Sequence, residues 1–422
     1  MGTTMAQRPR RNDRGSPGAS TKHPGRGGLG AALVALICAC QPEAETVYEY
    51  SGYEGEAFPD RIPPIAYPDR AVGLVTNSLS DTVSVVDVAT GSLIAERPVG
   101  RNPVDIDGPH HIVVDAQGAF AYVALSYPVA TAQGPHAIHG SSVQPGWVQK
   151  LALSDLSVVG QVRVDASPGE IVVSPDGSLV ITSHFDLLRA TQNPNDIEAA
   201  RATIAIAETA SMAILGSKPA RMVPVCVAPH GMVISETGSK LYVACYGEDR
   251  IAIVDLIDAE APVELIDVGP GVSGFGSPSY GPYALRFVDD ATIAISNTVS
   301  KDVRFFDTSS KTLDPSQTIT IFGTPYFPAV LSDGRLAIPS QQPDALYVVD
   351  RTGELETEIY NFSDECFLPH VVSQVGSDVA VVCEGDKEGA GALVVLDSVF
   401  EVVASLPLGV YPDSLLAVEV PR

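Results

Sequence analysis

The apolar residues of this 422-residue chain occur in short runs, rich in valine, isoleucine and alanine, that alternate with small-residue turns and polar loops. A proline stands at the entrance to one run in every unit, and the residue after it varies. The seven pairs are Pro109-His110, Pro168-Gly169, Pro229-His230, Pro282-Tyr283, Pro325-Tyr326, Pro369-His370 and Pro412-Asp413. Short strands repeated every 40 to 60 residues, roughly, are typical of a β-propeller.

The unit that begins at Pro229 indicates the order of the strands most clearly. It predicts strand a at 231–235, strand b at 240–244 and a strand c that ends at Asp255. The same aspartate ends strand c in four other units, as Asp87, Asp307, Asp350 and Asp397. Because an aspartate carboxylate accepts the backbone N–H two residues further on, we interpret these aspartates as turn formers rather than catalytic groups.

Both ends of the repeat are incomplete. Residues 71–100 supply strands b, c and d, whereas residues 411–420 supply a single strand a. Together they make one blade, and the six internal units bring the total to seven. Joining the two ends also removes open sheet edges. We therefore predict an all-β fold over residues 71–422, a seven-bladed β-propeller of four-stranded blades closed by N-terminal strands b to d and a C-terminal strand a.

Two segments of the chain resemble the YVTN-type repeat of seven-bladed propellers, the group that includes YncE-like periplasmic proteins. They read VGLVTNSLSDTVSVVDVATGSLIAERPVG and APHGMVISETGSKLYVACYGEDRIAIVDL. The resemblance covers most of residues 71–422 and implies the fold. Propellers of this group serve as binding platforms, enzymes and structural parts alike, so the resemblance leaves the function open.

Residues 1–39 have the features of a lipoprotein-type signal peptide. Residues 1–28 hold six Lys or Arg and one Asp, and a nine-residue apolar stretch follows at 29–37. Nine residues are too few for a membrane-spanning helix, which takes about 20. The string ICAC that ends at Cys40 resembles a bacterial lipobox, which implies lipidation of Cys40; plain secretion is the alternative. Residues 40–70 are acidic, lack a repeat and are interpreted as a tether.

The charge of the exported chain limits its partners. Without residues 1–39 the chain keeps 20 basic and 50 acidic residues, a net charge of −30. This charge repels nucleic acid and anionic lipid headgroups, so we expect no nucleic acid and expect the membrane as a partner only through the lipid anchor. The predicted location is a bacterial cell envelope, at the outer membrane in the periplasm or at the cell surface.

Four cysteines fall within the predicted propeller, two in each of two blades. Cys226 and Cys366 each lie three residues before an entrance proline, and Cys245 and Cys383 end strand b of the same blades. The start of strand a lies beside the end of strand b in an antiparallel blade, so each blade brings one pair together. In the oxidising compartment that export implies, we predict two disulfides, Cys226–Cys245 and Cys366–Cys383. The alternative pairs each of Cys226 and Cys366 with the histidine four residues later as metal ligands.

The residue after each entrance proline is where we expect the function, because strand a lines the central channel of a propeller and its first residues surround one mouth. In blade order from the closing blade, this ring is Asp413, His110, Gly169, His230, Tyr283, Tyr326 and His370. The three histidines are nearly evenly spaced. Converging neutral imidazoles suit Zn²⁺, Cu or Fe²⁺, with Asp413 or water completing the shell. His111 and Glu170 occupy the next position, and the sequence leaves open which of His110 and His111 faces inward.

We favour a hub without metal, whose histidines line a wet channel or hydrogen-bond across the turn, and keep the metal site as the alternative. Two resemblances bear on this choice. The PHG- and GPHH-type strings resemble those that supply hub copper ligands in nitrous oxide reductase propellers, which implies a redox metal site. They also resemble strand-a motifs of lactonase propellers, which use Arg and Glu; here Glu170 is the candidate catalytic residue and Arg286 the nearest arginine. Covalent c-type haem is excluded, because no C-x-x-C-H string occurs.

Two insertions between strands b and c, at 127–146 and 185–200, are predicted to overhang the ring beside His110. Long loops in a compact domain are usually functional or disordered. His136, His139 and the adjoining Trp147 are candidates for a ligand wall; the alternative is a solvated loop.

Two classes of function follow from these features. The first is a lipid-anchored binding or scaffold protein of the cell envelope, which engages an envelope protein or a small ligand through the face carrying the insertions. The second is a protein that uses its hub, either as a tri-histidine metal and redox site or as a lactonase-like hydrolase. We expect the binding protein rather than the enzyme, because no Ser-His-Asp set, phosphate loop or dinucleotide fingerprint is present.

Overall fold

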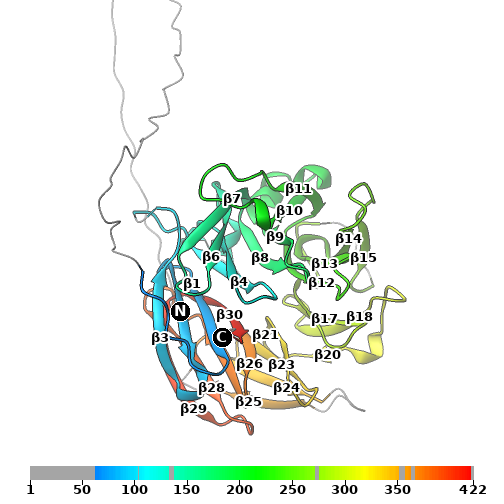
Figure 1. Cartoon of the computed structure of the whole chain (residues 1–422). Coiled ribbons are helices and arrows are strands. Elements are labelled where there is room, and N and C mark those ends of the chain that lie inside the picture. Colours follow the sequence, from blue (N-terminus) through cyan, green and yellow to red (C-terminus); the bar gives the residue numbers. More distant parts are fainter. Residues whose placement is uncertain are drawn as a thin grey trace, which may run out of the picture. The chain divides into compact units, whose positions relative to one another are not determined.

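Seven antiparallel sheets make up the propeller (Figure 1). The computed structural model describes residues 62–102, 104–132, 137–270, 275–350, 357–362 and 366–419. The signal segment, Cys40 and most of the predicted tether therefore lie outside the described residues. Each sheet is one blade, and we number the blades from the closing blade and order their strands from the innermost outward.

Blades one to four each contain four strands. Blade one consists of β30 (Pro412–Val418), β1 (Val72–Asn77), β2 (Thr82–Asp87) and β3 (Ser92–Pro98). Blade two consists of β4 (Pro109–Val114), β5 (Phe120–Leu125), β6 (Pro145–Ala152) and β7 (Val158–Ala166). Blade three consists of β8 (Pro168–Val173), β9 (Leu179–His184), β10 (Ala202–Glu208) and β11 (Arg221–Cys226). Blade four consists of β12 (Pro229–Ile234), β13 (Lys240–Cys245), β14 (Arg250–Asp255) and β15 (Glu264–Asp267).

Blades five and six keep four strand positions, with one position split in each. Blade five consists of β16 (Pro282–Phe287), β17 (Thr292–Asn297) and β18 (Asp302–Asp307), with β19 (Thr312–Leu313) and β20 (Ile319–Thr320) both pairing with β18. Blade six begins with β21 (Thr324–Pro325) and β22 (Ala329–Val330), followed by β23 (Leu336–Gln341), β24 (Ala345–Val349) and β25 (Thr357–Asn361). Blade seven consists of β26 (Pro369–Val375), β27 (Asp378–Cys383), β28 (Ala390–Leu396) and β29 (Val402–Val410).

Among the residues that the structure describes, helices occur only as short connections. They are η1 (Val88–Thr90), α1 (Ala137–Gly140), α2 (Leu187–Gln192), α3 (Ile197–Ala200), η2 (Thr209–Ser211), η3 (Tyr246–Glu248) and η4 (Pro315–Gln317). Within the described ranges, none of the helices has the length and apolar character needed to cross a membrane.

The ring closes through the first and last strands of the described chain. β30 pairs antiparallel with β1, so that Val72 lies opposite Val418 and Leu74 opposite Leu416. The innermost strands then contact one another from blade to blade, with β30 against both β4 and β26. The predicted fold, blade number and mode of closure are confirmed.

The end of the predicted tether packs against the propeller. The Ile65 side chain is 8% exposed and joins the core between blades one and two. Its amide donates to the carbonyl of Ser154 at 2.8 Å, and the Tyr67 hydroxyl donates to the carbonyl of Leu153 at 2.6 Å. The described part of this segment therefore adds to the core before the first strand begins.

A left-handed residue precedes the entrance proline in six of the seven blades. These residues are Gly108, Ser167, Ala228, Gly281, Leu368 and Tyr411, with φ between 50° and 65°. The carbonyl of each accepts the amide of the residue that follows strand b, as Gly108 accepts from Ser126 (2.9 Å) and Leu368 from Glu384 (3.0 Å). The same turn therefore places the start of strand a beside the end of strand b in each of these blades.

A β-bulge follows the entrance proline and aims two successive side chains at the hub. In blade two the pairing of β4 with β5 shifts between Pro109 and Ile112. His110 and His111 lie within this shift, and they are only 0% and 5% exposed. Because a bulge re-aims side chains that would otherwise alternate, both histidines face inward. The sequence had left open which of the two does so.

The aspartates that end strand c form the predicted turns in three blades. The carboxylates of Asp255, Asp307 and Asp397 each accept the backbone N–H two residues further on, at 2.9 Å. Asp87 differs, because its carboxylate instead forms an ion pair with Arg70. These groups hold turns at the propeller surface and take no part in the hub.

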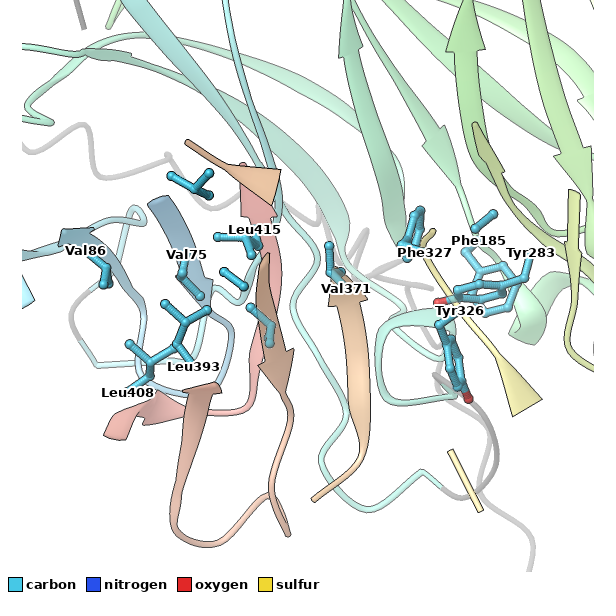
Figure 2. Close-up of a cluster of buried hydrophobic side chains, with 14 of the residues drawn as sticks. Val75, Val86, Phe185, Tyr283, Tyr326, Phe327, Val371, Leu393, Leu408 and Leu415 are labelled. Carbon is cyan, nitrogen blue, oxygen red and sulfur yellow. The ribbon is translucent and has the colours of Figure 1, made fainter. Parts of the chain in front are cut away.

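Aromatic side chains form much of the hub wall. Figure 2 shows Tyr283, Tyr326, Phe327 and Phe185 gathered on one side, across from valine and leucine side chains of blades one and seven. Phe327 lies in the break between β21 and β22, where its amide donates to the carbonyl of His370 at 3.1 Å. The break in strand a of blade six therefore turns a large apolar ring toward the axis.

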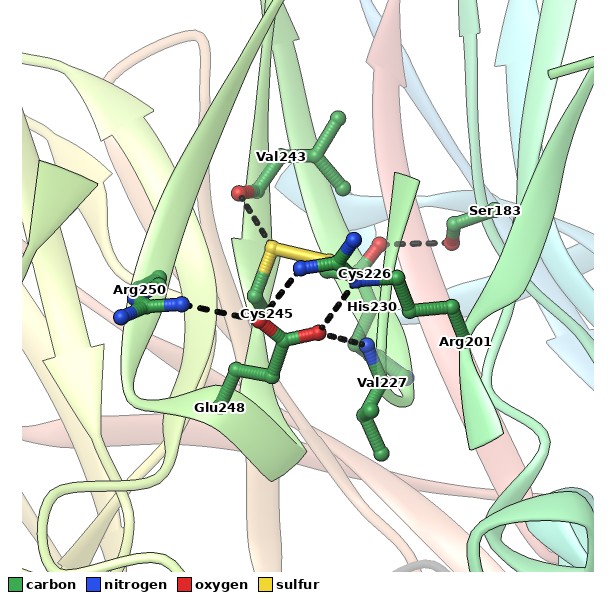
Figure 3. Close-up of a disulfide and its surroundings, with 9 residues drawn as sticks. All are labelled: Ser183, Arg201, Cys226, Val227, His230, Val243, Cys245, Glu248 and Arg250. Carbon is green, nitrogen blue, oxygen red and sulfur yellow. Dashed lines mark hydrogen bonds and ion pairs between the residues drawn. A yellow bond between two sulfur atoms is a disulfide. The ribbon is translucent and has the colours of Figure 1, made fainter. Parts of the chain in front are cut away.

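Both predicted disulfides are present. Cys226, the last residue of β11 in blade three, pairs with Cys245 of β13 in blade four, with Cα atoms 5.8 Å apart. Cys366, just before β26, pairs with Cys383 of β27 in blade seven, at 5.3 Å. Beside the first pair, the buried Glu248 carboxylate accepts the Val227 amide at 3.0 Å (Figure 3). The alternative interpretation of these cysteines as metal ligands is wrong, because their sulfur atoms are bonded to each other.

Candidate metal centre in the hub

The insertion at 127–146 covers the mouth where the innermost strands begin. Its helix α1 contacts β8 and α2, which belongs to the other insertion, and all four α1 residues are buried. His139 has no exposed surface. The insertion overhangs the ring as predicted, but its described part is packed structure rather than an open ligand wall. It adds His139 as a fifth histidine in the hub.

The side chains of His110, His139 and Asp413 converge in this buried region. The Nε2 atoms of His110 and His139 lie 3.1 and 3.0 Å from the same oxygen, Oδ2 of Asp413. None of the three side chains is exposed. The two imidazole rings stack with centroids 4.0 Å apart. Three polar groups from β4, α1 and β30 therefore meet at one point.

Hydrogen bonds fix which ring nitrogen of each histidine points at Asp413. His110 Nδ1 lies 3.1 Å from the carbonyl of Pro168, which can only accept, so Nδ1 carries the proton. His139 Nδ1 lies 2.7 Å from Ser126 Oγ, whose own proton goes to the carbonyl of Gly108 at 3.2 Å. Nε2 is therefore the ring nitrogen of each histidine that faces Asp413. Protein-bound metal ions commonly have histidine ligands held in this way, with the second nitrogen donating to the protein.

Burial and the neighbouring charges determine the protonation of this group. Burial lowers the pKa of His110 well below its usual value, so the ring is neutral at pH 7. Burial alone raises the pKa of Asp413, but His110, His139 and His370 outweigh it and hold the pKa well below the usual range. Imidazole and carboxylate groups bind metals in their deprotonated forms, which the lowered pKa values of His110 and Asp413 favour.

His370 supports Asp413 from the opposite side. Its Nδ1 donates to the Asp413 backbone carbonyl at 2.9 Å and lies 3.1 Å from Oδ1. Burial opposes the charged form of His370, but the carboxylates of Glu384 and Asp413 prevail and raise its pKa. Glu384 Oε1 is 3.6 Å from the same nitrogen, and burial raises the pKa of Glu384 to about 7. His370 and Glu384 therefore orient the Asp413 side chain, and the raised pKa of His370 favours a positive charge beside the two carboxylates.

The predicted tri-histidine set is divided by the structure. Within the described residues, three groups of side chains bring their ligand atoms within 4.8 Å of one another: His110 with His111 and His230, His110 with His139 and Asp413, and His370 with Glu384 and Asp413. The three predicted histidines all lie buried in the hub, but they do not form one group. His370 falls outside the group that contains His110 and His230. Even spacing of the three residues around the axis does not determine how far each side chain extends or which neighbour it meets.

Tyr283 and Tyr326, which follow entrance prolines, line the aromatic side of the hub and pack against histidines other than His110 and His139. Tyr283 stacks on His230 with centroids 3.9 Å apart, and Tyr326 meets His370 edge to face at 5.0 Å. Burial raises the pKa of both tyrosines well above 10, so both remain protonated. They fix the orientation of histidine rings.

A cavity of about 330 Å³ lies in the central channel, along the middle of the innermost strands. Its lining includes His111, Phe327, Glu170 and Arg286. Glu170 Oε2 accepts the Met232 amide at 2.6 Å, and burial raises the pKa of Glu170 to about 7 against the attraction of Arg286. The arginine and glutamate suggested by the lactonase resemblance therefore share one cavity.

Trp147 lies away from the hub. The guanidinium of Arg101 sits 3.6 Å above its ring, and both residues line a groove of about 680 Å³ that Leu215 also borders. His136, the other predicted member of the ligand wall, lies outside the described residues. Of the three predicted wall residues, only His139 is placed at the hub.

Sequence reasoning missed the roles of His139 and Glu384 beside Asp413. Glu384 follows the last residue of strand b, and its amide makes the same turn bond as that of Ser126 in blade two. In several blades the residue after strand b therefore lies beside the start of strand a, close to the hub. A comparison of this position among the repeats would have identified Glu384. His139 belongs to an insertion without a repeat, which left no positional signal.

No protein-family model and no curated protein matches the chain. Solved structures do match its fold. The periplasmic gluconolactonase of Pseudomonas aeruginosa gives a TM-score of 0.60 at 16% identity, covering 83% of this chain and 100% of that one. Hydrazine synthase of Kuenenia stuttgartiensis gives 0.54 at 15%, covering 75% and 92%. Virginiamycin B lyase of Staphylococcus aureus gives 0.52 at 13%, covering 73% and 88%.

These matches agree on architecture and differ in chemistry. The three proteins are named for three different activities, and each shares at most 16% of its aligned residues with this chain. Such similarity shows a common seven-bladed fold alone. The chain is a propeller of the kind found in gluconolactonase, and its function has to be argued from its own hub.

Proposed function

We propose that this protein binds one transition-metal ion in its hub, through Nε2 of His110, Nε2 of His139 and a carboxylate oxygen of Asp413. The observation that carries the proposal is the convergence of both Nε2 atoms on Asp413 Oδ2, at 3.1 and 3.0 Å. Ligand atoms about 2.1 Å from one ion lie about 3.0 Å apart at right angles and about 3.4 Å apart at tetrahedral angles, so small shifts from the present spacing accommodate a shared ion.

The chemistry of the three groups supports the same conclusion. A carboxylate is costly to bury unless it is paired or coordinates a metal. Two imidazoles and one carboxylate suit Zn²⁺, Cu²⁺ or Fe²⁺ rather than Ca²⁺ or Mg²⁺, which prefer oxygen ligands. His370 holds the Asp413 carboxylate from the far side, which is the role of a supporting residue around a metal ligand.

Metal analysis of the purified protein tests the proposal. Protein stripped with a chelator should take up about one equivalent of Zn²⁺ or Cu²⁺, measured by isothermal titration calorimetry and elemental analysis. Asp413→Asn should weaken the affinity by at least about tenfold. Asp397→Asn, which changes a half-buried turn aspartate outside the hub, should leave the affinity unchanged. Wild-type protein that takes up no metal contradicts the proposal.

We further propose that the protein works outside the cytoplasm, anchored through Cys40 to a membrane of the cell envelope. Two disulfides favour an oxidising compartment. A gluconolactonase with the same fold is periplasmic, which agrees with that location. A binding or scaffold role toward an envelope protein is compatible with the metal site and is tested by cross-linking in intact cells.

Hydrolysis in the central channel is the second candidate. Glu170 and Arg286 line one cavity, and a carboxyl group with a pKa of about 7 suits a general acid or base at neutral pH. A panel of sugar lactones tests this activity. Turnover that disappears in Glu170→Gln but persists in chelator-treated protein favours hydrolysis independent of the metal site.

A further inference from the structure

The proposed site is covered on the side of the insertions. Helix α1 is buried over the ring. It packs so closely on the second insertion that a Cβ atom added to Gly140 would lie 2.8 Å from the Leu187 side chain. His139 and Asp413 have no exposed surface. An ion that binds them without displacing this packed cover has to approach along the propeller axis from the other side.

The central cavity provides such an approach. Its lining residues become more buried from one end to the other: Arg286 is exposed, Glu170 is half-buried, and His111 and Phe327 are only 5% and 2% exposed. His111 therefore marks the inner end of the cavity. From there its ring reaches the His110 ring, with centroids 4.6 Å apart and the rings edge to face.

His111 also belongs to a second possible ligand group. The ligand atoms of His110, His111 and His230 lie within 4.8 Å of one another, as do those of His110, His139 and Asp413. His110 is common to both groups. The two sets of ligands therefore overlap, one at the inner end of the channel and one beneath the insertions.

We propose that the central channel is the route by which the metal ion enters, and that His111 and His230, with His110, form an entry site from which the ion passes to Asp413. This inference rests on the proposed metal function. The ion exchanges ligands while it stays bound to His110: bonds to His111 and His230 break as bonds to His139 and Asp413 form. Only metal–ligand bonds change, and the carboxylate of Asp413 draws the ion inward.

Neighbouring rings keep the entry histidines in place. Tyr283 stacks on His230 at 3.9 Å, and Phe327 packs against His111 at 4.8 Å between centroids. The hydroxyl of Ser183 donates to the His230 backbone carbonyl at 2.6 Å (Figure 3). These contacts hold both rings at the inner end of the channel without using a ring nitrogen.

Two charged residues in the channel act on a passing cation in opposite directions. Above its pKa of about 7 the Glu170 side chain is an ionised carboxylate and attracts the cation. The Arg286 guanidinium, fixed by a 3.1 Å bond from Nε to the carbonyl of Pro328, repels it. Fields focused in a narrow cavity change association rates by about tenfold or more. Removing either charge should therefore change the rate of metal entry, with opposite signs.

Stopped-flow measurement of Zn²⁺ uptake by chelator-treated protein tests the route, with a coloured chelator as the competing probe. His111→Ala should slow uptake severalfold while the final stoichiometry stays at one ion. Glu170→Gln should slow uptake by about tenfold at low salt, and Arg286→Gln should accelerate it. Glu401→Gln and Arg221→Gln, which neutralise exposed charges outside the cavity, are the matched controls and should leave the rate unchanged.

The outcomes separate this inference from the proposed function. Uptake that is tight in wild type, lost in Asp413→Asn and unchanged in rate by all three channel substitutions overturns the route and leaves the site intact. Uptake accelerated by a substitution that loosens the insertions, such as Gly140→Val, with no effect of His111→Ala, places entry on the opposite face and also overturns it. A wild-type protein without metal affinity overturns both proposals.

Discussion

The imidazole of His139 stacks on that of His110, with ring centroids 4.0 Å apart and planes inclined by 12°. His110 comes from a strand of the repeat, whereas His139 comes from an insertion between β5 and β6. The contact therefore joins a strand of the repeat to the insertion of blade two. We place the candidate metal centre where these two elements meet.

Replacing His139 should weaken metal binding without unfolding the protein. His139→Ala removes one of three ligands, so the affinity for Zn²⁺ should fall by at least about tenfold in calorimetric titrations. His184→Gln is the matched control. His184 is also buried, but its ring nitrogens bond to the Asp165 amide and to Thr203, away from Asp413. Equal losses in the two variants contradict the assignment of His139.

The stability of the protein should depend on Glu170 between pH 4.5 and about 7. Burial raises the pKa of Glu170 from 4.5 to about 7, so in this window the folded state keeps a proton that the unfolded chain releases. Wild type should therefore lose stability relative to Glu170→Gln as the pH rises through the window. Urea unfolding of both proteins at several pH values measures the difference, and parallel curves would contradict the raised pKa.

Each disulfide should stabilise the propeller. The two bonds join residues 19 and 17 positions apart, for which loop closure contributes about 3 kcal/mol. Replacing both cysteines of either pair by serine should lower the free energy of unfolding by roughly this amount. Cys366 lies four residues before His370, and Cys383 immediately precedes Glu384, so the loss of this pair should also reduce metal affinity. Chemical denaturation and metal titration of the two double variants measure these effects.

Gly231 should tolerate no side chain. A Cβ atom there would lie 2.7 Å from the Cα of Ala284, on the innermost strand of the next blade, and in contact with the carbonyl of Tyr283. Gly231→Ala should therefore destabilise the protein by about 1–3 kcal/mol. Gly389→Ala is the comparison, because its Cβ would meet only Asp386 Oδ1 at 3.7 Å. Thermal unfolding of both variants distinguishes a close blade contact from a general effect of alanine.

Cys40 should carry the lipid anchor. Cys40→Ser should move the protein from the membrane fraction to the soluble fraction, because the lipobox-like string then lacks its acceptor thiol. Fractionation and incorporation of labelled fatty acid measure the change. A soluble wild type would argue for plain secretion instead, and labelled fatty acid on the serine variant would place the lipid on another residue.

The fold could be predicted because its determinants repeat. Entrance prolines and strand-ending aspartates recur from blade to blade, and cysteines at matching positions of two blades, such as Cys226 and Cys366, specify which strand ends are neighbours. The alternation of apolar residues then fixes the faces of each strand. An error in placing the strands of one blade does not carry over to the next, because the repeated residues of each blade indicate its strand positions independently.

The candidate site could be predicted only in part, because its geometry depends on side-chain reach. The position after each entrance proline was enough to predict four hub residues: His110, His230, His370 and Asp413. It did not indicate which of these residues approach one another. The β-bulge that turns both His110 and His111 inward has no mark in the sequence. The contact of His139 with Asp413 depends on how an irregular insertion folds over the ring.

Closure of the ring by β30 also orders events during biosynthesis. Asp413 lies on the last described strand, whereas His110 lies on the first strand of the second blade. A chain that leaves the ribosome from its N-terminus presents both histidines long before the carboxylate that joins them. The centre therefore exists only once blade one is completed, so a chain that crosses a membrane unfolded would acquire its metal on the far side.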